Sequence, residues 1–121
     1  MDIQTNANNN ADRYVFISLP MRGLTIEEIR ERMEKIFKPF KKSGYKLINT
    51  IWLEPEPDNL KHHTYYLGKS ISEMCRADVV VFASDWAKAS GCRIERMICN
   101  TYDIPKLEED ILAYVDQVKF D

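Results

Sequence analysis

The chain has 121 residues, a formal net charge of -2 at pH 7, and 45% hydrophobic and 30% charged residues. This length predicts one globular domain and leaves no room for a second. Because no block of like charge forms a basic face, nucleic acid is not expected as a partner. No apolar run approaches the roughly 20 residues that span a bilayer, so we expect a soluble, cytoplasmic protein without a membrane partner.

The first residues of the chain differ in composition from the rest. Residues 1–13 are rich in asparagine and lack the basic start and apolar stretch of a secretory signal. We interpret them as a disordered tail before a single domain that covers residues 14–121.

The cysteines and histidines do not predict a metal site. Cys75, Cys92 and Cys99 are odd in number and lack the close paired spacing of zinc ligands, so we expect buried, reduced thiols. His62 and His63 are adjacent but have no further ligand at a suitable spacing. Neither a metal nor a cofactor is therefore expected.

The first elements follow from hydrophobic patterns. Residues 14–18 are a short continuous apolar run, typical of a strand that is covered on both faces of a parallel sheet. Thr25 and Glu28 form a capping box, and apolar residues then recur at steps of three and four. This pattern predicts a helix that ends near Lys42, where Pro39 disturbs its last turns.

A second strand is predicted over residues 46–51, followed by an extended loop. Residues 78–83 contain three consecutive valines and predict a buried strand. A second helix between these strands is expected to turn four residues inward: Leu67, Ile71, Met74 and Cys75.

A third helix is predicted from Ser90 to Tyr102. Its inward residues are expected to be Ile94, Met97, Ile98, Thr101 and Tyr102. Residues 104–107 indicate a short last strand, and the apolar residues of the predicted terminal helix are Ile111, Leu112, Val115 and Val118. The alternation of strands and helices predicts an α/β fold, a small doubly wound parallel sheet of about four strands with helices on both faces, flavodoxin-like or Rossmann-like.

Such sheets bind ligands where the loops after the strands meet at the carboxyl edge. These loops are residues 19–23, 52–63 and 84–91. In the first loop Pro20, Arg22 and Gly23 precede the start of a helix, where backbone N–H groups and a guanidinium suit a phosphate. An ordinary strand-to-helix turn is the alternative interpretation.

The third loop leads to a candidate carboxylate. Ser90 and Gly91 begin a predicted helix, and Glu95 lies one turn further along, beside the apolar face of that helix. An exposed glutamate in a first helical turn is the alternative, and periodicity alone favours it.

Aromatic residues cluster near the same loops. Trp52, Tyr65, Tyr66 and Trp86 offer surfaces on which a base stacks, although aromatic residues at such places commonly close the rim of a core. The sequence has neither a G-x-G-x-x-G fingerprint nor a G-x-x-x-x-G-K-[ST] loop, which argues against a dinucleotide oxidoreductase and a nucleoside triphosphatase.

Three segments together resemble a known family. They are Ile17-Ser18-Leu19-Pro20-Met21-Arg22-Gly23, Ala77-Asp78-Val79-Val80-Val81, and Asp85-Trp86 followed by Ser90-Gly91-Cys92-Arg93-Ile94-Glu95. In this order, on the predicted elements, they are similar to the nucleoside 2-deoxyribosyltransferase-like proteins, especially a small branch of that family. The resemblance spans residues 14–105.

The resemblance implies an activity and a site. In this family the glutamate of the G-x-x-x-E segment attacks the anomeric carbon of a nucleoside or nucleotide, and that role would fall to Glu95. Water or a second base then resolves the covalent glycosyl-enzyme. The expected substrate-binding residues are Ser18, Pro20, Met21, Arg22, Gly23, Trp52, Tyr66, Ser70, Trp86, Ser90 and Gly91. Related small domains form oligomers, so a homo-oligomer is expected.

The sequence departs from the family pattern at three positions. Ser70 stands where family members carry an aspartate that positions the sugar or handles a proton, and Ala89 and Leu19 replace a serine and a small residue. Asp85 is a candidate to replace the lost carboxylate, with a loop-capping aspartate as the alternative. Two hypotheses follow: an enzyme that cleaves or exchanges the N-glycosidic bond of a nucleoside or nucleoside 5'-monophosphate, and a module that binds or sequesters a nucleotide-derived metabolite without turnover.

Overall fold

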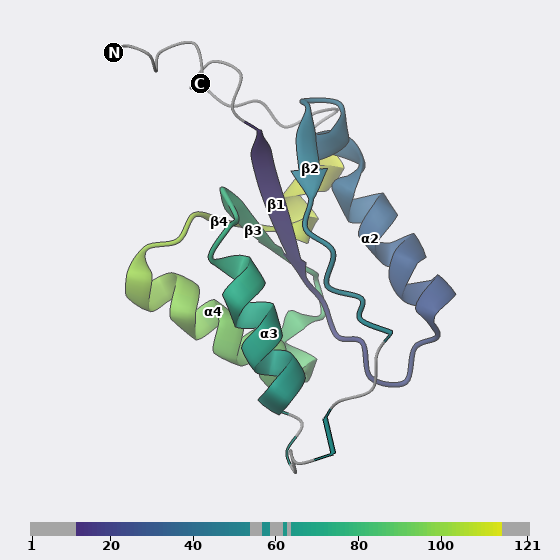
Figure 1. Ribbon diagram of the computed structural model, residues 1–121. Helices are drawn as coiled ribbons and strands as arrows, with labels where there is room; N and C mark the ends of the chain where they lie inside the picture. The colour runs from purple at the N-terminus through teal and green to yellow at the C-terminus, as the bar shows by residue number, and fades with distance from the viewer. Residues whose placement is uncertain (1–11, 54–56, 59–61, 63, 115–121) are drawn as a thin grey trace.

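The fold is built around a four-stranded parallel sheet (Figure 1). The computed structural model describes residues 12–53, 57–58, 62 and 64–114. The strands are β1 (Arg13–Ser18), β2 (Tyr45–Leu47), β3 (Val79–Phe82) and β4 (Lys106–Glu108). They lie in the order β2-β1-β3-β4, and every pair is parallel, so the predicted small α/β sheet is confirmed.

The register of the central strands brings their carboxyl ends together. Val15 pairs with Val79 and Ser18 pairs with Phe82, so β1 and β3 end side by side. β2 pairs with the first half of β1, and the chain after it continues along β1 because Ile48 N donates to Val15 O. The loops after β1, β2 and β3 therefore leave the same edge of the sheet.

Helices cover both faces of the sheet (Figure 1). Helix α2 (Ile26–Lys41) lies on one face, and α3 (Thr64–Met74) and α4 (Ser90–Tyr102) lie on the other. The alternation of side chains along a strand explains the two layers. Val15 and Ile17 pack in the cluster on the α2 side, whereas Phe16 packs in the cluster that contains Met74 and Cys99.

Helix α2 begins and ends close to where the sequence predicts. Thr25 Oγ1 accepts from Glu28 N, and the Glu28 carboxylate accepts from Thr25 N, which is the predicted capping box. The helix ends at Lys41, and Gly44 has a φ of 86°, a conformation that suits glycine. Pro39 is buried inside the last turn and does not end the helix earlier.

The predicted inward face of α4 is wrong at four positions. Ile94 is 38% exposed, Met97 64% and Tyr102 73%, Thr101 is also exposed, and only Ile98 is half-buried. The buried residues of α4 are Cys92, Glu95 and Cys99. The apolar spacing predicts the wrong face because the face that packs on the sheet contains the carboxylate of Glu95. Burial of a carboxylate is costly unless it is hydrogen-bonded.

Other boundaries also differ from the predictions. β2 ends at Leu47, although a strand over residues 46–51 was expected, and Cys75 is exposed, whereas Cys92 and Cys99 are buried as expected. Cys75 follows the end of α3, which turns Met74 inward and leaves the next side chain outside.

The end of the described chain is a short helix. Two 3-10 helices, η1 (Trp86–Lys88) and η2 (Glu109–Tyr114), complete the elements of the described chain, and Leu112 of η2 packs against the cluster on the α2 side. The predicted contributions of Val115 and Val118 to a terminal helix, and residues 1–11 of the predicted tail, lie outside the described residues. No helix in the described part of the chain is long and apolar enough to cross a membrane.

Candidate active site

A cavity of about 440 Å³ opens at the carboxyl edge of the sheet, beside the end of β1. It lies between the loop after β1, the start of α2, the loop after β2, and helices α3 and α4. Its described lining residues are Phe16, Ile17, Leu19, Pro20, Met21, Ile26, Ile29, Thr50, Ile51, Trp52, Tyr66, Leu67, Ser70, Ala89, Gly91, Cys92 and Glu95. Most of these side chains are apolar or aromatic, which is typical of a small-molecule site.

Glu95 is the charged side chain among these residues, and it is 5% exposed. Its Oε1 accepts a hydrogen bond of 2.7 Å from Ser18 Oγ, and its Oε2 accepts one of 2.7 Å from Ser70 Oγ. The three residues come from β1, α3 and α4. One carboxylate is therefore held from both sides by hydroxyl groups on two other elements.

The environment changes the acidity of this carboxylate. Burial raises the pKa of Glu95 above its ordinary value of 4.5, because the charged form loses contact with water. The hydrogen bonds from Ser18 and Ser70 act in the opposite direction and favour the charged form. A buried carboxyl with a raised pKa in a cavity is a candidate nucleophile or acid–base group.

The local sequence explains how the three residues meet. Ser18 is the last residue of β1 and lies on the same side of the strand as Phe16, toward α3 and α4. Glu95 follows Cys92 by three residues and precedes Cys99 by four, so all three share the face of α4 that packs inward. The hydrogen bond from Ser18 therefore joins the carboxyl end of β1 to the buried face of α4.

The start of α4 has no side-chain cap. Ala89 occupies the N-cap position and makes no side-chain hydrogen bond, and Ala89 and Gly91 both line the cavity. Side-chain oxygens at this position normally accept from the free N–H groups of the first turn. The amino terminus of α4, with its partial positive charge, is thus turned toward the space beside Glu95.

An aromatic wall forms another side of the cavity. The rings of Trp52 and Tyr66 lie 6.3 Å apart at an angle of 15°, and both residues line the cavity. Lys69 Nζ lies 4.8 Å from the Trp52 ring, and Tyr65 contacts Tyr66 edge to face. The loop after β2 and helix α3 thus contribute the stacked pair Trp52 and Tyr66 to the lining of the cavity.

The structure brings many of the predicted site residues together. Pro20, Met21, Trp52, Tyr66, Ser70, Gly91 and Glu95 line the cavity, and Ser18 contacts Glu95. Besides Ser18, the predicted residues outside the described lining are Arg22, Gly23, Asp85, Trp86 and Ser90. Arg22, Gly23 and Ser90 are exposed, and Gly23 has a φ of 86° in the turn before α2.

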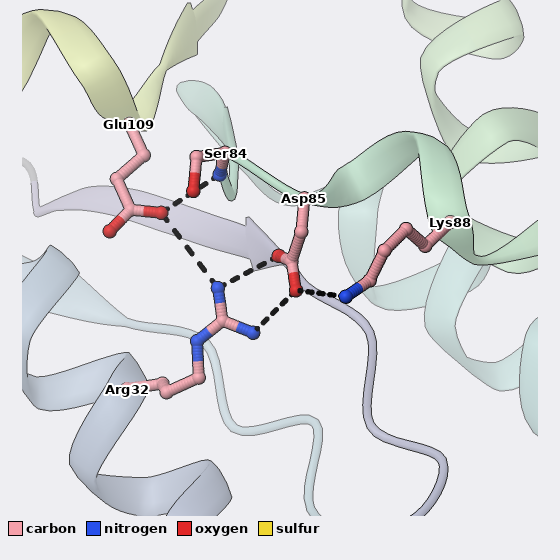
Figure 2. Close-up of polar contacts among 5 residues, drawn as sticks. All are labelled: Arg32, Ser84, Asp85, Lys88 and Glu109. Carbon is pink, nitrogen blue, oxygen red and sulfur yellow. Dashed lines mark hydrogen bonds and ion pairs between the residues drawn. The ribbon is translucent and has the colours of Figure 1, made fainter.

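Asp85 belongs to an ion-pair network outside the lining of the cavity. Figure 2 shows its carboxylate facing the guanidinium of Arg32, which donates to both oxygens at 2.8 and 3.2 Å. Glu109 lies 3.9 Å from the same guanidinium and accepts from Ser84 N, while Lys88 lies 3.8 Å from Asp85. The hydrogen bond from Arg32 lowers the pKa of Asp85. These contacts tie the loop after β3 to α2 and η2, which the prediction of a catalytic Asp85 did not anticipate.

Trp86 packs on the core and not along the cavity. Its ring lies 6.1 Å from the ring of Phe82, and the guanidinium of Arg96 lies 4.4 Å from the Trp86 ring. Arg96 in turn pairs with Glu108 of β4 at 2.6 Å. Trp86 therefore closes the rim of the core, the alternative that the sequence left open.

Sequence reasoning missed Thr50 and Cys92 as lining residues. Thr50 is 4% exposed, and its hydroxyl has no hydrogen-bond partner among the described residues. Its signal was a hydroxyl residue directly before Ile51, at the end of the predicted second strand. His62 is exposed, and His63 lies outside the described residues. No group of three potential metal ligands gathers in the described part of the chain.

Comparison with protein families, with curated proteins and with solved structures finds no match for this chain.

Proposed function

We propose that the protein cleaves or exchanges the N-glycosidic bond of a nucleoside or nucleoside 5'-monophosphate, with Glu95 as the nucleophile. The observation that carries this proposal is a carboxylate, 5% exposed, whose two oxygens each accept a serine hydrogen bond inside a largely apolar cavity. Two serines fix the direction of the carboxylate, and burial reduces its hydration. Both effects favour attack on an electrophilic carbon.

The reaction proceeds in two steps. In the first, an oxygen of Glu95 forms a bond to the anomeric carbon while the bond from this carbon to the base nitrogen breaks. The electron pair of that bond leaves with the base, which takes a proton from water. In the second, water attacks the same carbon, the bond from this carbon to Glu95 breaks and its electron pair returns to the carboxylate, and the proton that the water loses neutralises the hydroxide left by the first step. A second base in place of water gives exchange.

The cavity suits the two halves of a nucleoside. About 440 Å³ is within the usual range of roughly 300–1,000 Å³ for small-molecule sites. The stacked Trp52 and Tyr66 match the planar face of a base, and Glu95 lies where polar hydroxyls gather, which suits a sugar ring. The resemblance to the nucleoside 2-deoxyribosyltransferase-like family supports the same assignment.

The second candidate function is binding of a nucleotide-derived metabolite without turnover. It is favoured by Ser70, which donates to Glu95 where the resembling family carries an aspartate. Each oxygen of Glu95 already accepts a hydrogen bond, and no second carboxylate occurs among the described lining residues. Loss of a positioned acid–base group typically lowers a rate by about 10²–10⁴-fold.

One experiment separates the two functions. Wild-type protein is incubated with a panel of nucleosides and 5'-monophosphates, and free base is measured by chromatography. Glu95→Gln is the test variant, and Glu31→Gln, an exposed glutamate on α2, is the matched control. Base release by wild type and Glu31→Gln but not by Glu95→Gln supports catalysis. A ligand-induced rise in melting temperature with no base release in any variant supports the binding function.

We also propose a cytoplasmic location and a homo-oligomer for this protein. The motifs that resemble the small branch of the family support the second of these assignments, because related small domains assemble with neighbours. Light scattering of the full chain measures the assembly directly, and a monomer over the whole concentration range would contradict it.

A further inference from the structure

Thr50 carries a buried hydroxyl that the protein itself leaves unpaired. The residue is 4% exposed, and its Oγ1 has no hydrogen-bond partner in the described structure. An unpaired buried polar group lowers stability, so such groups are uncommon unless something else satisfies them. In this protein the group lies in a residue that lines the cavity beside Glu95.

The position of Thr50 relates it to the aromatic wall. It lies two residues before Trp52 on the loop that leaves β2, and both residues line the cavity. Asn49 Oδ1 accepts from Ile51 N at 3.1 Å, which orders the loop between them. Rotation about the Cα–Cβ bond moves a threonine hydroxyl between staggered positions, so this side chain is able to turn its oxygen toward a ligand.

We propose that Thr50 is a specificity-determining residue whose hydroxyl bonds the polar edge of a base stacked against Trp52. The inference rests on the proposed function, because it takes a nucleoside as the ligand. A planar base on the aromatic wall presents its ring nitrogens and exocyclic groups sideways, and a hydroxyl either donates to or accepts from them. Ser18 and Ser70 already donate hydrogen bonds to Glu95. Among the described lining residues, Thr50 carries the buried hydroxyl that has no hydrogen-bond partner.

The test compares Thr50→Val, Thr50→Ser and wild type in the full-length protein. Calorimetry measures the affinities for adenosine, guanosine, cytidine, uridine and thymidine, and thermal unfolding measures the stability without ligand. Valine keeps the shape of threonine but removes the hydroxyl, whereas serine keeps the hydroxyl. We expect Thr50→Val to lose about tenfold in affinity for the preferred nucleoside and to change the ratio of affinities among the bases, with Thr50→Ser close to wild type.

The stability without ligand gives an independent readout. Removal of an unpaired buried hydroxyl leaves the melting temperature of Thr50→Val equal to or above that of wild type. A hydroxyl with a structural role would instead give a lower melting temperature in this variant. An equal or higher melting temperature together with a loss in affinity is therefore the expected combination.

Each other outcome overturns the inference in a recognisable way. Equal affinities of wild type and Thr50→Val, or a uniform loss for all bases, would show that Thr50 does not read the base. A lower melting temperature of the unliganded Thr50→Val protein would show that its hydroxyl supports the fold. Wild-type protein that binds no nucleoside would overturn the proposed function as well, which separates that failure from failure of the role of Thr50 alone.

Discussion

Ser70 Oγ donates a 2.7 Å hydrogen bond to Oε2 of Glu95, across the space between α3 and α4. A carboxylate in the place of Ser70 would repel Glu95 and raise its pKa, whereas the hydroxyl favours the charged form. The hydroxyl of Ser70, a neutral group, therefore helps to keep the carboxyl group of Glu95 charged. Ser18 has the same relationship with the other oxygen.

Ser70→Ala tests this relationship. The variant removes one of two donors to Glu95, so the pKa of Glu95 rises further and the acidic limb of the pH–rate profile moves to higher pH. Loss of a hydrogen bond to a charged group lowers base release by roughly 10- to 100-fold. Ser72→Ala, an exposed serine on the same helix, is the control. A slower variant with an unshifted profile would contradict the proposed role of Ser70.

Glu95→Gln tests the effect of burial on stability. Since the folded protein raises the pKa of Glu95, the carboxyl favours folding while it is protonated and opposes it once it is charged. The variant is expected to melt at a higher temperature than wild type at neutral pH. This difference shrinks as the pH falls below the raised pKa and vanishes below the ordinary value of 4.5. Thermal unfolding across this pH range measures the difference. A difference that is independent of pH would contradict a pKa of Glu95 that burial raises.

Asp85→Asn tests the assignment of Asp85 to the ion-pair network. Loss of the bidentate pair with Arg32 is expected to destabilise the protein by about 1 kcal/mol, since both side chains are partly exposed. Because the pKa of Asp85 is lowered, its contribution is present above the ordinary value of 3.8 and is lost as the pH falls through the lowered pKa. Denaturant unfolding at neutral and acidic pH measures both effects.

The same variant separates stability from catalysis. Asp85 is outside the described lining of the cavity, so base release per folded molecule stays within about twofold of wild type. Asp110→Asn, an exposed aspartate of η2, is the control for the unfolding measurement. A loss of base release of about 100-fold or more in folded Asp85→Asn protein would restore the catalytic interpretation.

Trp52→Ala tests the aromatic wall. Stacking of a base on an aromatic side chain contributes about 1–3 kcal/mol, so the affinity for nucleosides is expected to fall by roughly 5- to 100-fold, with Trp52→Phe in between. Leu53→Ala changes the adjacent side chain, which is 66% exposed, and should bind as wild type does. Calorimetry that finds equal affinities in all four proteins would place the base elsewhere.

The sequence predicts the sheet well because its signals are local and strong. The continuous apolar runs identify both central strands, and the Thr25–Glu28 capping box identifies the start of α2. The face of α4 is mispredicted because Glu95 occupies the buried stripe, and hydrogen bonds from distant residues make this burial possible. No spacing rule contains that information.

The sequence predicts only part of the site, because it indicates which loops meet but not which side chains face the cavity. Order along the chain brings Glu95, Ser70 and Trp52 to one sheet edge, since parallel strands end together. It does not specify which side chains at this edge turn inward. Asp85 turns to Arg32, which is 53 positions away in the sequence, and Thr50 reaches the cavity because β2 ends earlier than its apolar pattern suggests.

The central claim is that Glu95 attacks the anomeric carbon, and intact-mass spectrometry with a 2'-fluoro-2'-deoxyarabinosyl nucleoside tests it most directly. The fluorine destabilises the oxocarbenium-like transition states of both steps, so a covalent intermediate that has formed is hydrolysed slowly enough to be detected. The account predicts that wild-type protein gains the mass of one fluorinated sugar, located on the peptide that contains Glu95, and that Glu95→Gln gains none. An unmodified wild-type protein, or the same adduct on another residue, would contradict it.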